Sequence, residues 1–195
     1  EQFLTLAGQY PVLDVRSPGE YEHAHIPGAY GLALFSDEER KQVGTAYKQQ
    51  SREAAIKIGL DYFGVKMKKM VEEAESITAN HKLQTSNLKH ETSNTVLVHC
   101  WRGGMRSAGV AWLLDLYGFK VYTLVGGYKA YRKWALAQFE KEYSFQIIGG
   151  FTGSGKTEVL QALPGAGHTI INLEALASHK GSAFGAIEGK PQPKQ

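Results

Sequence analysis

The sequence predicts an α/β protein in which a parallel-sheet domain, residues 1–142, is followed by the truncated start of a second α/β domain, residues 143–195. Three observations lead to this prediction. Short apolar runs alternate with segments of helical periodicity, as in parallel sheets whose strands are joined by helices. The only cysteine lies in a glycine-containing loop between such a run and a helix, and a glycine-rich phosphate-binding motif follows another apolar run.

Length and composition limit the classes of protein that remain. At 195 residues the chain has room for one domain and part of another. Its hydrophobic and charged fractions, 43% and 21%, are ordinary for globular proteins, and no apolar run approaches a membrane span, so we expect a cytoplasmic protein with no membrane partner. A single cysteine excludes an internal disulfide and a cysteine-rich zinc site. The net charge of +3 neither requires nor excludes nucleic acid.

The first predicted strand covers residues 10–15 and is followed by a polar turn, a short helix and a Pro-Gly turn. Asp14 and Arg16 stand at the carboxyl end of this strand, where the sites of α/β proteins assemble. They are candidates to support a site, and a structural salt bridge between the two is an equally good interpretation.

Two helices are predicted next. Ser36 and Glu39 form a capping box at the start of the first helix, and the second helix covers about residues 53–75. The basic residues of this region are interpreted either as a solvated face or as a surface for a polyanion. They are Arg40, Lys41, Lys48, Arg52 and Lys57. Residues 78–94 are polar without apolar periodicity and are predicted to form a surface loop.

The cysteine loop begins after a buried strand predicted at residues 96–98 and leads into a helix predicted at residues 107–117. Such a loop points successive backbone N–H groups at one centre, and the helix adds the positive end of its dipole. We therefore expect an anion site that lowers the pKa of Cys100, with Cys100 and Arg106 as catalytic residues. A cysteine kept only for packing is the alternative. The remaining residues of the predicted anion-binding loop are Trp101, Arg102, Gly103, Gly104 and Met105.

A strand at residues 120–125 and a helix at residues 130–141 complete the first predicted domain. A further strand, residues 145–149, leads into a match to the phosphate-binding pattern GxxxxGK[ST]. In this pattern Lys156 reaches the outer phosphates, and the hydroxyl of Thr157 can hold Mg²⁺. The glycines of the pattern are Gly150, Gly153 and Gly155.

The segment after this motif contains one more predicted strand, residues 168–173, and a predicted helix, residues 174–179, before the polar tail GKPQPKQ. A mononucleotide-binding domain needs several more strands, whereas only roughly 50 residues follow the first domain. We therefore expect the chain to be an N-terminal fragment of a longer protein. It begins at Glu1 without a methionine, so we expect that the true N-terminus is also missing.

Three motifs resemble those of rhodanese domains. They are DVRSPGEYEHAHIPGA in residues 14–29, HCWRGGMRS around Cys100, and VYTLVGGYKAY in residues 121–131. The resemblance implies a rhodanese-like parallel-sheet domain. The cysteine motif also resembles the signature of cysteine-dependent phosphatases, which generally lack the first motif.

A rhodanese-like domain followed by a P-loop resembles the tRNA 2-selenouridine synthase family, as do the phrases DEERKQVGTAYKQQSREAAIKIG and NLEALASHKGSAFG. The resemblance implies replacement of sulfur by selenium in wobble 2-thiouridine of tRNA, with selenophosphate as donor. It also implies geranyl transfer to that sulfur from geranyl diphosphate, and as partners tRNA and an enzyme that supplies selenophosphate. Asn172 stands where the family pattern implies an acidic residue, and no metal ligand is assigned.

In the expected mechanism the Cys100 thiolate attacks selenophosphate and holds selenium as a selenyl-sulfide, while Arg106 and the loop amides stabilise the phosphate. No required cofactor is assigned, and the P-loop ligand is left open between a nucleotide with Mg²⁺, geranyl diphosphate and tRNA. The alternatives are a rhodanese-type sulfurtransferase, a phosphatase that uses the same loop, and a non-catalytic binding module, which the presence of Cys100 disfavours. We expect the fragment alone not to complete the reaction.

Overall fold

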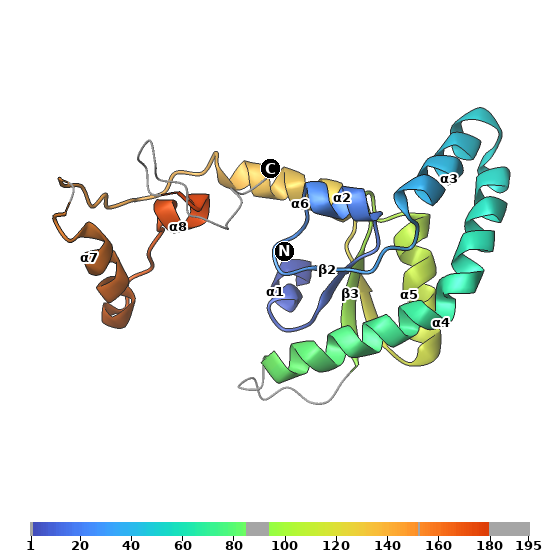
Figure 1. Cartoon of the computed structure of the whole chain (residues 1–195), viewed down its shortest axis with the longest axis horizontal. Coiled ribbons are helices and arrows are strands. Elements are labelled where there is room, and N and C mark those ends of the chain that lie inside the picture. The colour runs from blue at the N-terminus through green and yellow to red at the C-terminus, as the bar shows by residue number, and fades with distance from the viewer. Residues whose placement is uncertain (1, 85–93, 152, 180–195) are drawn as a thin grey trace. The chain divides into compact units, whose positions relative to one another are not determined.

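The computed structural model describes residues 2–84, 94–151 and 153–179 of the 195-residue chain. The chain divides into two compact units, a first unit of residues 1–140 and a second unit of residues 141–195. The first unit contains, in chain order, α1 (Gln2–Ala7), β1 (Val12–Asp14), α2 (Pro18–His23), β2 (Tyr30–Gly31), α3 (Asp37–Gln49), α4 (Arg52–Gln84), β3 (Thr95–His99), α5 (Met105–Tyr117), β4 (Lys120–Thr123) and α6 (Gly127–Gln138) (Figure 1).

Within the described residues, the strands of the first unit form one parallel sheet in the order β2-β1-β3-β4. Every residue of the central strand β3 is buried. Helices cover both faces of a parallel sheet, which is why the sequence of this strand is a nearly continuous apolar run. Asp14 on β1 lies beside His99 on β3, so the carboxyl ends of the two strands meet at one edge of the sheet.

Side chains along β3 alternate between two cores. Val96 and Val98 pack in the larger core with residues of α4 and α5, while Leu97 packs in the smaller core with Phe3 of α1 and Tyr128 of α6. The picture agrees, because α4 and α5 lie on the side of β3 away from α1 (Figure 1). This alternation decides which face of the sheet each residue at the end of the strand can reach.

Most elements predicted for the first unit are confirmed, although several boundaries differ by a few residues. The capping box at the start of α3 is also confirmed. The backbone N–H of Ser36 donates to the Glu39 carboxylate at 2.7 Å, and the N–H of Glu39 donates to the Ser36 hydroxyl at 3.2 Å.

The surface loop predicted at residues 78–94 is wrong in its first part, because α4 continues to Gln84. The buried side of the helix extends past the predicted end: Ala74 and Thr78 are both buried, and the Thr78 hydroxyl donates to the Ala74 carbonyl at 2.7 Å. A threonine bonded in this way remains compatible with a helix although its side chain is polar. The rest of the predicted loop, residues 85–93, lies outside the described residues.

The second unit contains α7 (Lys156–Ala162), a 3₁₀ helix (Leu163–Ala166) and α8 (Leu173–Ala177). The strands predicted at residues 145–149 and 168–173 are wrong, since neither segment is a strand. A strand exists only through hydrogen bonds to a neighbouring strand, and the described part of this unit offers none. The tail GKPQPKQ lies beyond the residues that the structure describes.

Asn172 directly precedes α8 and serves as its N-cap. Its side-chain oxygen accepts a hydrogen bond from the backbone N–H of Ala175 at 3.0 Å. Asparagine is among the preferred residues for this position, so a local capping role explains it.

No helix in the described part of the chain combines the length and apolar character that crossing a membrane would require.

The loop after β3 and the turn after β4 approach each other so closely that glycine is required. Gly127 has a φ of +59°, and a Cβ there would overlap the carbonyl oxygen of Cys100. Gly103 has a φ of +65°, and a Cβ there would lie 2.7 Å from the Leu124 carbonyl oxygen. Left-handed backbone and lack of space therefore act together at both positions.

Replacing Gly127 by alanine should lower the free energy of unfolding by about 2–4 kcal/mol, because left-handed strain adds to the overlap with Cys100. Urea unfolding followed by circular dichroism measures this loss. Gly28→Ala is the matched control, since Gly28 has a φ of +77° but a Cβ there would meet nothing within 4 Å. We expect about 1 kcal/mol for the control. Equal losses in the two variants would show that the close approach contributes nothing.

Candidate active site at the Cys100 loop

Cys100 is the first residue after β3, and the loop that it opens ends at Gly104, the N-cap of α5. Alternation along the strand places its side chain in the larger core, on the same side as Val98. The free thiol is only 3% exposed, and it contributes to the wall of a cavity. One sulfur atom is thus held at a fixed position where a strand becomes a helix.

Hydrogen-bond donors surround this sulfur. The Ser107 hydroxyl lies 3.2 Å away, and the backbone N–H groups of Ser107, Gly104 and Arg102 also bond to it. Burial alone would raise the pKa of the Cys100 thiol, but these hydrogen bonds outweigh burial and lower the pKa below its ordinary value. The loop therefore favours the thiolate, which is the nucleophilic form of cysteine.

The Ser107 hydroxyl has a second partner, the Gly104 carbonyl oxygen, at 3.0 Å. A hydroxyl carries only one proton, so its bonding must follow the state of Cys100. With a thiol, the S–H donates to Ser107 and the hydroxyl donates to Gly104. With a thiolate, the hydroxyl donates to sulfur, and Gly104 keeps the backbone N–H of Ala108 at 3.1 Å.

Arg106 is held by the carboxylate of Glu20 in α2, which lies 86 residues earlier in the chain. Its Nη1 donates to Glu20 Oε2 at 2.8 Å, and Nε of Arg40 lies 2.9 Å from the same oxygen. Burial alone would raise the pKa of Glu20, but Arg106, the Ser17 N–H and Arg40 together lower it. Glu20 is therefore an ionised bridge that connects α2, α3 and α5.

The other predicted loop residues have different environments. Trp101 packs against Tyr128, with ring centroids 5.8 Å apart, while Arg102 is exposed. Met105 is 51% exposed and is the first residue of α5, so it follows the loop and is not part of it.

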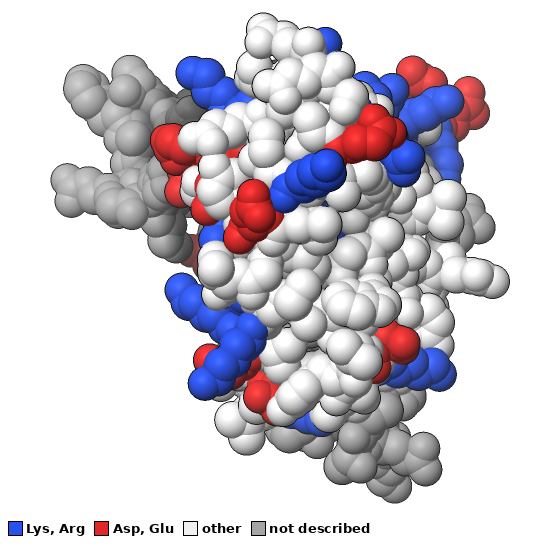
Figure 2. Space-filling view, turned by 90° about the vertical axis from the view of Figure 1, so that its right-hand side faces the viewer, with Lys and Arg blue, Asp and Glu red and all other residues white. Residues whose placement is uncertain are grey.

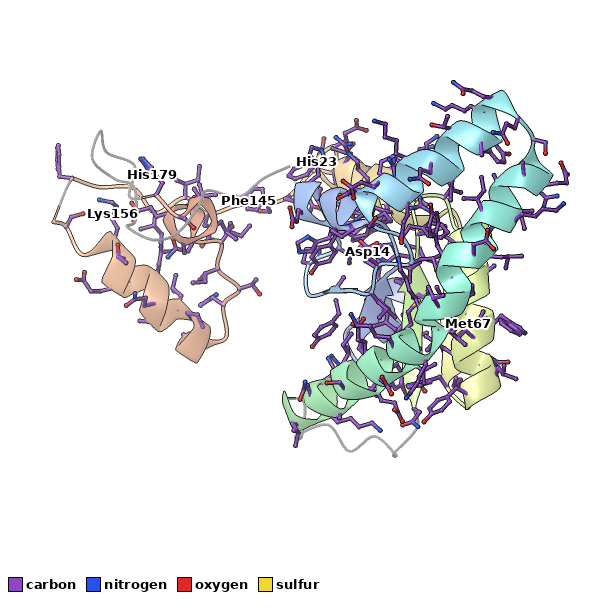
Figure 3. The ribbon with its side chains drawn as sticks, turned by 45° about the vertical axis from the view of Figure 1, so that its right-hand side comes forward. Asp14, His23, Met67, Phe145, Lys156 and His179 are labelled. Carbon is purple, nitrogen blue, oxygen red and sulfur yellow. The ribbon has the colours of Figure 1, made fainter. Side chains whose placement is uncertain are left out.

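Asp14 and Arg16 form a buried ion pair at the end of β1. The guanidinium donates to both carboxylate oxygens over distances from 2.6 to 3.0 Å and lies 4.0 Å from the ring centre of Tyr128. Asp14 lies inside the first unit (Figure 3), and both side chains are at most 1% exposed, so neither is open to an incoming ligand. Burial lowers the pKa of the neighbouring His99, which leaves its ring neutral.

A cavity of about 1040 Å³ opens beside the Cys100 loop, bordered by α3, α4 and α5. The described residues that line it include Cys100 and several cations, and none of them is Asp, Glu or His. Figure 2 shows that side of the first unit, with charged side chains around a broad uncharged area. Most of the lining is apolar and includes Leu34, Phe35, Val43, Ile56, Phe63 and Trp112. The cavity thus brings together the Cys100 sulfur, apolar walls and positive charge.

The P-loop lies in the second unit, and Lys156 stands at the start of α7 (Figure 3). Its ammonium group donates to the carbonyl oxygens of Gly150 and Phe151 at 2.9 and 2.8 Å. The lysine therefore spans the loop through main-chain acceptors, while Thr157 is exposed. The loop glycines with positive φ are Gly150, Gly153 and Gly155.

Two residues of the Cys100 site are not among the predicted site residues. Ser107 is the last residue of the cysteine motif HCWRGGMRS, and its position in the first turn of α5 could have indicated that its hydroxyl lies close to Cys100. Glu20 lies in the first rhodanese-like motif as the capping-box partner of Ser17, but nothing in that pattern indicates its contact with Arg106. In the ranges that the structure describes, no three His, Cys, Asp or Glu side chains gather closely enough to hold a metal ion.

Comparisons with known proteins divide the chain in two. Residues 1–133 match the rhodanese-like domain family, and residues 143–195 match the tRNA 2-selenouridine synthase AAA domain. Similar curated proteins are the tRNA 2-selenouridine synthases of Nitrosomonas europaea, 39% identical, and Bdellovibrio bacteriovorus, 41% identical, each over 95% of this chain. The chain spans about half the length of these relatives, 46% in both cases.

A solved structure is also similar. The N-terminal domain of a proposed ATP/GTP binding protein from Clostridium difficile 630 is 39% identical, with a TM-score of 0.55. The match covers 66% of this chain and 90% of that chain. Because the rhodanese-like match spans more than half of the sequence and agrees with the parallel sheet and its cysteine loop, the chain belongs to the rhodanese-like domain family.

Proposed function

We propose that this chain carries the selenium-transfer centre of a tRNA 2-selenouridine synthase, which replaces sulfur by selenium in wobble 2-thiouridine with selenophosphate as donor. The observation that carries the proposal is the sulfur of Cys100, whose pKa is lowered, despite burial, by the Ser107 hydroxyl and the loop N–H groups. The similarity to tRNA 2-selenouridine synthases over 95% of the chain supports the choice of substrate. Cys100 and Arg106 are the catalytic residues in this proposal.

The covalent step must balance electrons. Selenium in selenophosphate is already at the oxidation level of selenide, so forming a sulfur–selenium bond with loss of phosphate would require an oxidant. Attack of the Cys100 thiolate on phosphorus requires none: a sulfur–phosphorus bond forms, the phosphorus–selenium bond breaks, and its electron pair leaves with selenium as hydrogen selenide. The covalent intermediate is then a cysteinyl phosphate, in place of the selenyl-sulfide expected from the sequence.

The remaining steps need no redox partner either. Selenide attacks C2 of the 2-thiouridine and sulfur leaves as sulfide, while water hydrolyses the cysteinyl phosphate and restores the thiolate. Selenide is a weak base and departs without a general acid, which agrees with a described cavity lining that holds no Asp, Glu or His. An alkoxide leaving group would need such an acid. The same lining therefore disfavours the phosphatase alternative.

The loop supplies the binding of the phosphate. Its backbone N–H groups and the guanidinium of Arg106 can donate hydrogen bonds to the phosphate oxygens, and those from the guanidinium are charge-assisted. Arg102 adds positive charge from an exposed position. Asp14 and Arg16 support the loop from below through Tyr128 and do not touch the donor.

The proposal extends to partners and to the second unit. tRNA is the substrate, an enzyme that makes selenophosphate supplies the donor, and the reaction takes place in the cytoplasm. The P-loop residues, with Lys156 at their centre, bind a chain of phosphates from a nucleotide or from geranyl diphosphate, and Thr157 is the position at which Mg²⁺ would bind.

Selenophosphate labelled separately in phosphorus and in selenium tests the covalent step. We expect the phosphorus label to stay on Cys100 after denaturation and the selenium label to be released. Cys100→Ser, a nearly isosteric change, should acquire neither label while its circular dichroism spectrum stays unchanged. Selenium retained on Cys100 would contradict the cysteinyl phosphate and support a selenyl-sulfide intermediate. Labelling of the Cys100→Ser variant would show that Cys100 does not form the covalent intermediate.

The pH dependence of Cys100 alkylation by iodoacetamide tests the stabilised thiolate. Because hydrogen bonds lower the pKa of Cys100, the deprotonated and reactive form persists to lower pH than for an ordinary thiol. Ser107→Ala removes one donor, so the midpoint of the profile should move to higher pH and the rate at neutral pH should fall. Ser51→Ala, which removes a hydroxyl at the start of α4, should leave the midpoint in place. An unshifted midpoint in Ser107→Ala would contradict this role.

The apolar cavity favours a second activity, the transfer of a geranyl group to the same sulfur of 2-thiouridine. A geranyl group is a methyl-branched apolar chain, which in geranyl diphosphate carries a diphosphate at one end. The cavity offers apolar walls with Arg40, Arg102 and Arg106 among its lining. Burial of such a chain gains about 0.8 kcal/mol per methylene. The cavity therefore suits the hydrocarbon end of geranyl diphosphate.

Gly44 and Gly64 provide a matched test of the cavity. A Cβ on either glycine would meet nothing within 4 Å, and both lie in helices, but only Gly44 lines the cavity. Gly44→Leu should weaken geranyl diphosphate binding roughly tenfold in calorimetry, equivalent to about 1.4 kcal/mol, while Gly64→Leu has no effect. If Lys156→Ala abolishes binding and Gly44→Leu does not, the P-loop and not the cavity holds this ligand.

A further inference from the structure

A row of aromatic rings begins at the Cys100 loop and continues along α6. Ring centroids are 5.8 Å apart between Trp101 and Tyr128, 5.8 Å between Tyr128 and Tyr131, and 5.9 Å between Tyr131 and Trp134. The three rings on α6 are spaced three residues apart, so they follow one side of the helix. The row becomes more exposed away from the sheet, from 6% for Tyr128 to 39% for Trp134.

Exposed cations lie beside this row. Arg132 and Lys133 follow Lys129 by three and four residues, so the three cations lie on one side of the helix, next to the side that carries the rings. The sequence from Gly126 to Phe139 contains no Asp or Glu. The backbone N–H of Lys129 donates to the Trp101 carbonyl at 3.0 Å, which fastens this surface to the catalytic loop.

We propose that this side of α6 is a stacking surface for single-stranded RNA, which holds the unpaired nucleotides next to the base that reacts with selenide released at the Cys100 loop. The inference rests on the proposed function, because it takes the RNA to be the tRNA substrate. Unpaired bases stack on aromatic side chains, and neighbouring cations take the phosphates. A paired stem hides its base faces, so this surface selects a loop over a duplex.

The basic residues of α3 and α4 fit RNA less well. Arg40 is paired with Glu20, and Lys41 and Lys48 line the apolar cavity. None of these cations stands beside a continuous row of rings like that of α6. Charge alone would attract RNA to both surfaces, but only α6 combines charge with stacking.

Titration of the 195-residue chain with an RNA hairpin, followed by fluorescence anisotropy, tests the surface. Trp134→Leu should weaken binding roughly tenfold, the usual effect of losing one stacked base. Trp134→Phe keeps a ring and should retain most of the affinity. A fully paired duplex of the same length should bind more weakly than the hairpin and show no dependence on Trp134.

The cations are tested by the salt dependence of hairpin binding. Changing Lys129, Arg132 and Lys133 together to Gln should reduce the slope of log affinity against log salt by about 2, since each phosphate contact on a single strand contributes roughly 0.7. Lys68→Gln with Lys69→Gln is the control, because these lysines are 89% and 77% exposed on α4, away from the row of rings.

Each outcome separates this inference from the proposed function. Equal affinity for the hairpin in Trp134→Leu, in the triple Gln variant of α6 and in the double Gln control of α4 would overturn the stacking surface. Phosphorus labelling of Cys100 in the same preparations would then leave the proposed function standing. Hairpin binding that depends on Trp134, in a protein whose Cys100 is not labelled by selenophosphate, would support the surface and overturn the proposed chemistry.

Discussion

The start of α6 holds the Cys100 loop in shape. Its backbone N–H groups at Tyr128 and Lys129 donate to the carbonyls of Cys100 and Trp101 at 2.8 and 3.0 Å. Because these carbonyls turn outward to α6, the N–H groups of the loop can turn inward to the sulfur, as the lowered pKa of Cys100 reflects. The approach is close enough to require glycine at position 127, so the proposed anion site depends mainly on the backbone of two turns.

The ion pair beneath this contact leaves the charge of the loop undisturbed. Asp14 is neutralised by Arg16, and burial keeps His99 neutral, so no net charge lies under the thiolate from that side. Arg16 also rests on the ring of Tyr128, the second residue of α6. The buried pair at the end of β1 thereby supports the same helix that shapes the loop, which gives it a structural function without contact with a ligand.

Local signals suffice to predict the elements around the loop. A β-branched run indicates β3, a Ser36–Glu39 pair indicates the start of α3, and the glycines after the cysteine indicate the tight loop before α5. Local signals do not predict contacts between residues that are distant in the sequence. Glu20 and Arg106 are 86 residues apart, and no sequence pattern indicates that they form a hydrogen bond. An apolar composition alone does not predict a strand, because a strand also needs a neighbouring strand to pair with. Ile147 lies in a strand-like apolar run, yet it is 92% exposed and has no described partner strand.

The bridge from Glu20 to Arg106 has a consequence for turnover. An anion that binds Arg106 must displace the Glu20 carboxylate from its guanidinium. Because Glu20 belongs to the same chain, it competes with the anion at a high effective concentration. Part of the attraction for the incoming anion is therefore offset, and Arg106 can return to Glu20 when phosphate leaves. In the proposed reaction the site would exchange one counter-ion of Arg106 for another, so the departing phosphate would meet a competitor already in place and would inhibit only weakly.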